Sequence, residues 1–156
     1  MSWVPRYSGG DQLAGCMWLA RLIDKARRYE AAGLTPGEML GDYMFGNNDY
    51  MDAKLLHFLG LQDAQICEIV RAEPDDERAA QLIVERSGKT PEQCAAFSRA
   101  FARGNGLFIA MMDADEGRGK SGFVPSLMKA AYNALIFPIG ILMYRSSSRK
   151  QNRTGG

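Results

Sequence analysis

Residues 13–29 separate apolar and charged positions with a helical period. One face of the wheel collects small and apolar side chains: Leu13, Cys16, Leu19, Ala20, Leu22, Ile23 and Ala26. The other face collects charges beside two large side chains: Met17, Trp18, Arg21, Asp24, Lys25 and Arg28. This pattern predicts an amphipathic helix whose apolar side faces a core.

Two further stretches, residues 35–38 and 90–93, have the form of a capping box, in which Thr is followed three residues later by Glu or Gln. Proline at the first helical position strengthens both signals. We therefore expect one helix to begin near residue 36. A second is expected to include residues 94–103 and to stop at Gly104.

Acidic residues predict three more helical starts. Asp49 precedes a run that ends at Gly60, Asp63 precedes residues 64–72, and Asp75 and Asp76 precede residues 77–86. Carboxylates accept hydrogen bonds from the free N–H groups of a first helical turn and favour its positive dipole end. The apolar run at 107–112 is too short for periodicity to distinguish helix from strand.

These signals predict an all-α protein. Its body, residues 1–118, is expected to be a compact bundle of about six short helices. A glycine-rich stretch, residues 119–122, then serves as a hinge before a C-terminal apolar helix at 123–144. Residues 145–156 are basic and rich in serine, and we expect them to form a flexible tail.

Composition and charge narrow the class of protein. The chain is 46% hydrophobic and 24% charged, as in ordinary globular proteins. Residues 1–144 carry 15 basic and 18 acidic groups, whereas the last twelve residues carry four basic groups and no acid. An acidic body does not favour nucleic-acid binding. Three widely spaced cysteines and the lack of an N-terminal apolar run predict a cytoplasmic body.

The charged face of residues 13–29 has three interpretations. Arg21, Asp24, Lys25 and Arg28 can form a solvated face with ion pairs between successive turns. They can instead bind an anion or a partner, with Trp18 as a flat anchor. In the third interpretation, Arg21 and Asp24 are buried together as a structural ion pair.

The sequence contains no complete motif for nucleotide binding, calcium binding or catalysis. Residues 114–121 resemble a phosphate loop, but Asp115 and Glu116 would place negative charge in its cradle. The acids from Asp113 onward lack the spacing of a calcium loop. His57 is the single histidine and lies among apolar residues, which is typical of a structural role. Asn47, Asn48, Asp49 and Asp52 offer oxygen atoms, although a turn and a helix cap explain them. We expect no cofactor, no metal and no catalytic residue.

The apolar segment 123–144 has about the length of a bilayer span, but Lys129, Asn133 and Pro138 interrupt it. It can pack as a last core helix, lie on the cytoplasmic membrane face, or span or pack within a membrane complex. The residues expected to attach it are Leu135, Ile136, Phe137, Ile139, Ile141, Leu142 and Tyr144, with Arg145, Arg149 and Lys150 on anionic lipid.

The body resembles the bacterial family described as domain of unknown function 5069. The sequence Trp-Leu-Ala-Arg-Leu-Ile-Asp-Lys-Ala-Arg at 18–27 carries the resemblance, which continues at 55–61 and 107–117 and covers roughly residues 10–118. The chain departs from the family pattern at 46–49 and after Gly119. The resemblance implies a small helical cytoplasmic bacterial domain and no particular activity.

Together these features predict a non-catalytic helical accessory subunit of a larger assembly. We expect a protein partner, a membrane protein complex, and a location at the cytoplasmic face of the inner membrane. The alternative is a soluble protein or enzyme that binds a small anion through Arg21, Lys25 and Arg28.

Overall fold

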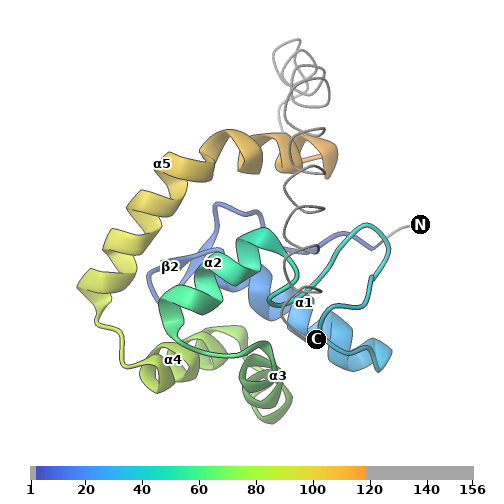
Figure 1. The fold of residues 1–156 in the computed structure, drawn as a ribbon, viewed down its shortest axis with the longest axis horizontal. Helices are drawn as coiled ribbons and strands as arrows, with labels where there is room; N and C mark the ends of the chain where they lie inside the picture. The colour runs from blue at the N-terminus through green and yellow to red at the C-terminus, as the bar shows by residue number, and fades with distance from the viewer. Residues whose placement is uncertain (1–2, 119–156) are drawn as a thin grey trace, which may run out of the picture. The chain divides into compact units, whose positions relative to one another are not determined.

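The computed structural model describes residues 3–118, which are mostly helical (Figure 1). This confirms the predicted all-α class in outline. The elements in chain order are β1 (Gln12–Leu13), β2 (Cys16–Met17), α1 (Leu19–Ala32), α2 (Tyr50–Leu59), α3 (Asp63–Ala72), α4 (Asp76–Ser87) and α5 (Pro91–Asp115). The chain divides into two compact units, Met1–Ile109 and Ala110–Gly156, and α5 contributes residues to both.

The first helix begins later than its pattern predicts. Residues 12–17 form a small antiparallel hairpin in which Leu13 pairs with Cys16. Its two turn residues, Ala14 and Gly15, have φ of 48° and 76°, the left-handed values that suit a tight hairpin turn. The apolar face was nevertheless predicted correctly, because all seven of its residues are buried.

Helix α1 is the centre of the first unit. It packs against α3 and α4, and these two helices also contact each other (Figure 1). Eight of its fourteen residues are buried, including Arg21 and Lys25. A helix buried on this much of its surface must find internal partners for its charged side chains.

Capping signals in the sequence correctly predicted where three of the other helices begin. The Asp49 carboxylate accepts hydrogen bonds from the backbone N–H groups of Met51 and Asp52 at the start of α2. Asp75 caps α4 in the same way. At the start of α5, the Gln93 side chain accepts from the Thr90 N–H at 2.9 Å, which forms the predicted capping box.

Two further predicted boundaries are wrong. At 35–38 the Glu38 carboxylate accepts from the Thr35 N–H at 2.6 Å, but the chain continues as turns to α2. Helix α5 runs through Gly104 for 25 residues, because Phe101, Asn105 and Ile109 continue its buried face at a spacing of four. Residues 107–112 are therefore helical, and two predicted short elements form one helix.

Helix α5 is joined to the rest of the first unit by side chains. The Ser98 hydroxyl accepts from the Met17 N–H at 2.8 Å and donates to the Gly15 carbonyl at 2.9 Å. The ring of Phe97 stacks on Phe58 of α2, with centroids 4.4 Å apart. Within the second unit, α5 ends in a turn where the Arg118 N–H donates to the Asp113 carbonyl at 2.7 Å.

Candidate functional site

Trp18 enters α1 in an unusual backbone conformation. Its φ is 73°, in the left-handed region that bulky side chains rarely adopt. The side chain is 1% exposed, and the indole Nε1 donates to Asp52 Oδ1 at 2.7 Å. Tertiary packing and this buried hydrogen bond hold a conformation that the local sequence disfavours.

Asp52 is the centre of a buried group that we call the Asp52 cluster: Trp18, Lys25, Gly46, Asp49 and Asp52. The Lys25 ammonium lies 2.7 Å from Asp52 Oδ2, and the two side chains are 1% and 0% exposed. The Gly46 N–H donates to the same oxygen at 3.0 Å. Three donors from separate parts of the chain therefore meet one carboxylate.

The second helix and the loop before it complete the surroundings of Lys25. Its ammonium also donates to the Met44 carbonyl at 3.0 Å and to Asp49 Oδ2 at 3.3 Å. Asp49 thus caps α2 with one oxygen and contacts Lys25 with the other. The ammonium has three internal acceptors, so its burial leaves none of its charge without a partner.

Burial, opposed by Lys25 and the Trp18 indole and assisted by the nearby Asp49 carboxylate, raises the pKa of Asp52 to about 6. Loss of water around a carboxylate disfavours its charged form, whereas an adjacent cation favours it. Asp52 is therefore ionised at neutral pH and paired with Lys25.

Arg21 lies beside this cluster between two aromatic rings. Its guanidinium is 5.3 Å from the centre of the Trp18 ring and 5.5 Å from that of Tyr43. One terminal nitrogen donates to the Tyr7 carbonyl at 2.9 Å, and the residue is 1% exposed. Stacking on aromatic faces suits the weakly hydrated guanidinium.

A second charged group, the Asp76 cluster, consists of Arg6, Tyr7, Asp24, Arg27 and Asp76. Asp76 accepts from Arg27 Nε at 2.6 Å and from the Tyr7 hydroxyl at 2.9 Å. Arg6 contacts Asp76 at 2.5 Å, and its backbone N–H donates to Asp24 at 2.6 Å. Burial acts to raise the pKa of Asp76, but its bonds with Arg27 and Tyr7 outweigh burial and lower that pKa.

Arg27 also closes the end of α3. Its two terminal nitrogens donate to the carbonyls of Val70 and Glu73, at 2.7 and 2.8 Å. These carbonyls lie at the negative end of the α3 dipole, where a cation is favourable. A single side chain therefore joins α1 to the end of α3 and the start of α4.

In the structure, the predicted site residues lie in three different places. Trp18, Arg21 and Lys25 lie together in or beside the Asp52 cluster, and all three are buried. Asp24 belongs to the Asp76 cluster and contacts Arg6 rather than Arg21 in the bonds described above. Arg28 alone is exposed. The interpretation as a solvated face is thus wrong for Arg21 and Lys25.

Sequence reasoning missed the role of the acids that complete both clusters. Asp52 was interpreted as part of a turn and cap, and Asp76 as an acid near a helix start. The one available signal for Asp52 was its place among Met51, Leu55 and Leu56, which are buried with it. No spacing rule connects Lys25 to an acid 27 residues later in the chain.

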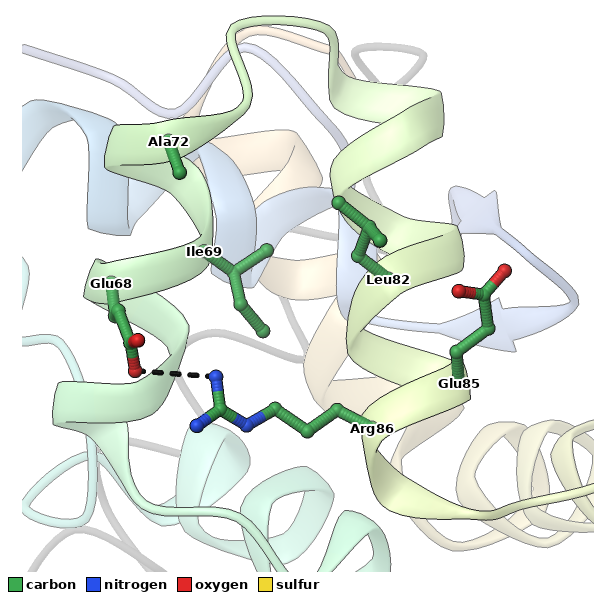
Figure 2. A pocket seen from close by; sticks show the side chains of 6 residues that line it. All are labelled: Glu68, Ile69, Ala72, Leu82, Glu85 and Arg86. Atoms are coloured by element: carbon green, nitrogen blue, oxygen red, sulfur yellow. Dashed lines mark hydrogen bonds and ion pairs between the residues drawn. The ribbon is translucent and has the colours of Figure 1, made fainter.

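Two shallow grooves lie away from these clusters. Figure 2 shows the first, of about 340 Å³, between α3 and α4, with Ile69 and Leu82 in its wall and an Arg86–Glu68 ion pair of 3.2 Å across its rim. The second, of about 330 Å³, lies between the hairpin and α5; its lining residues are Gln12, Met17, Ala95, Ser98, Arg99 and Ala102.

Within residues 3–118, no group of three or more His, Cys, Asp or Glu side chains is arranged to hold a metal ion. His57 is exposed on α2. Over the same described range, no helix combines the length and the apolar character needed to cross a membrane. The expected attachment residues, Leu135 to Lys150, and the predicted hinge, helix and tail lie outside the described residues.

A small helical domain organised around two charge clusters, one buried and one partly exposed, is the class that this geometry defines. The chain belongs to the family described as domain of unknown function DUF5069, whose pattern matches residues 4–118. No curated protein and no solved structure matches the chain. The matched region includes every residue of both clusters and excludes residues 119–156.

Proposed function

We propose that the protein is a non-catalytic helical accessory subunit that joins a larger assembly. The observation that supports this most is the internal use of the charged side chains on α1. Lys25 binds Asp52, Asp49 and the Met44 carbonyl, and it is 1% exposed. Side chains committed to holding the fold together are not offered to a substrate, so the body acts as a scaffold.

Attachment occurs, in this proposal, through residues 123–144 at a membrane or a membrane protein complex. Support comes from the change in composition after the glycine-rich stretch and from the four cations in the last twelve residues. A cytoplasmic body followed by an apolar segment and a basic tail suits the anionic inner face of a bacterial membrane. The body then forms a cap on its partner.

The small-anion alternative has less support. It required Arg21, Lys25 and Arg28 to share an accessible face, but Arg21 and Lys25 are each 1% exposed. The Arg21 guanidinium donates to the Tyr7 carbonyl and lies beside two aromatic rings. Arg28 alone does not make a binding site.

Fractionation of native cells tests the proposal. We expect the full chain in the membrane fraction at low salt, and Ile139→Glu with Leu142→Glu to move it to the soluble fraction. Ile139→Val with Leu142→Ile is the matched control and is expected to stay. Arg149→Gln with Lys150→Gln is expected to increase release by salt if the tail binds anionic lipid.

A wholly soluble full-length protein at low salt would disprove membrane attachment. Purification in mild detergent then tests the accessory role. We expect a stoichiometric protein partner with the full chain and with the control variant. Purification of the full chain as a single species from native cells, with no partner in either fraction, contradicts that role.

A further inference from the structure

The outer side of α5 between residues 96 and 107 is exposed and carries no acid, whereas Glu92 and Gln93 are exposed on the same side at the start of the helix. At 100° per residue its exposed positions span an arc of about 160°. Five of them are small or apolar and two are arginines: Ala96, Arg99, Ala100, Arg103, Gly104, Gly106 and Leu107. Leu107 is 53% exposed. The solvent side of a surface helix is ordinarily polar, so this arc has the composition of a covered face.

Two positions in this arc are glycine, although no contact or backbone conformation within the described chain requires glycine there. Glycine in a helix interior lowers helix stability. Neither Gly104 nor Gly106 has a positive φ, and a Cβ added at either position would meet no atom within 4 Å. A close approach by another molecule to the α5 backbone explains both positions, because only glycine leaves that backbone bare.

The two arginines of the arc lie one helical turn apart. Neither Arg99 nor Arg103 forms a side-chain hydrogen bond or ion pair with any residue in 3–118. Most other arginines of the first unit do have such partners; Arg27 and Arg71 are examples. Like charges four residues apart repel each other on a helix, so an external anion would stabilise the pair.

The groove of about 330 Å³ borders this arc and shares Arg99 with it. Met17 from the hairpin and Ala95 and Ala102 from α5 give it an apolar lining. A side chain from a molecule lying along α5 can enter this groove while its carboxylates reach the arginines. The arc and the groove together form the α5 face.

We propose that the α5 face binds an acidic amphipathic helix of a partner protein. Small residues allow two helices to approach closely, Leu107 supplies an apolar contact, and arginine binds carboxylates in a two-pronged geometry. A second copy of this chain would bring the same arginines together across a twofold axis. A lipid surface would gain little from alanine and glycine. This inference rests on the proposed role as an interaction module but not on residues 123–144.

Photocrosslinking of the full chain in native cells tests this surface. A photoreactive phenylalanine analogue at Leu107 keeps a large apolar side chain there, and the same analogue at Gln81, exposed on α4, is the control. We expect one protein adduct from position 107 only. The crosslinked segment, mapped by mass spectrometry, should be a helix with acids three or four residues apart.

Charge reversal then tests the arginines. Arg99→Glu with Arg103→Glu should reduce the adduct at least tenfold, whereas Arg99→Lys with Arg103→Lys should retain most of it. Arg78→Glu on α4 is the matched control. Gly104→Ala with Gly106→Ala should also reduce the adduct, although the added methyl groups meet open space within the chain. Thermal melting confirms that each variant is folded.

Several outcomes overturn the proposal. They are an adduct with a second copy of the chain, an adduct with lipid, a partner segment without acids, and a yield no higher than from position 81. The membrane proposal is separable, because the crosslink is repeated with Ile139→Glu and Leu142→Glu. A retained adduct from a detached protein supports the α5 face and leaves membrane attachment to the fractionation result.

Discussion

Lys25→Met removes the cation that neutralises the most buried carboxylate of the described chain. The change leaves Asp52 at 0% exposure with the Trp18 indole and the Gly46 N–H as donors. Removing one member of a buried ion pair typically costs about 3–5 kcal/mol of stability. We expect this loss near pH 7.5, where the unpaired Asp52 must either stay charged or take up a proton.

The stability cost of Lys25→Met should also depend on pH. The pKa of Asp52 is raised by burial to about 6, and Lys25 restrains that rise. Without Lys25 the pKa climbs further, so over a window above pH 6 the folded variant binds a proton that the folded wild type does not. The cost of the substitution should therefore fall as the pH is lowered, by up to about 1.4 kcal/mol per pH unit, and level off below pH 6.

The raised pKa of Asp52 also determines how the stability of the wild-type protein changes with pH. A folded pKa above the unfolded value of 3.8 means that the folded state holds the Asp52 proton more tightly. The stability contributed by this protonation is fully present below the unfolded pKa and is lost as the pH rises through about 6. The ion pair with Lys25 replaces it at neutral pH.

Urea unfolding followed by tryptophan fluorescence at pH 5, 6, 7 and 8 measures both effects, since Trp18 lies in the cluster. Arg28→Met is the matched control, because Arg28 lies on the same helix and is exposed. A cost of Lys25→Met below about 1 kcal/mol at pH 7.5, far under the range for a buried pair, would refute the reasoning. So would a cost that does not change with pH.

Four further substitutions test other parts of the fold by the same unfolding assay. Gly104→Ala and Gly106→Ala should each stabilise the protein by up to about 1 kcal/mol, because alanine favours the helix and its Cβ meets open space; destabilisation would show a hidden contact. Arg27→Met should cost about 3 kcal/mol or more, since its charged hydrogen bonds to Asp76 and the end of α3 are lost together; a cost below about 1 would contradict this. Arg28→Ala should change stability by no more than about 0.5 kcal/mol, as an exposed position does.

Local chemistry explains which helices were predictable. Asp49 and Asp75 accept hydrogen bonds from N–H groups two or three residues later, so the cap and its helix are encoded in one short stretch. The capping signal at Thr35 predicted a helix that does not form. The contact of Thr35 with Glu38 forms, but no apolar run with helical spacing follows it.

The helical class, the buried face of α1 and most helix starts were predictable, because these features depend on contacts within about one helical turn. The role of the charged face depends instead on long-range packing. Lys25 pairs with Asp52, Arg21 with the Tyr7 carbonyl, and Asp24 with Arg6. These partners lie 14 to 27 residues away along the chain, and packing of α2 and the N-terminal segment against α1 brings them into contact. A helical wheel describes the charges that share a face but not the acids and carbonyls that the fold places opposite them.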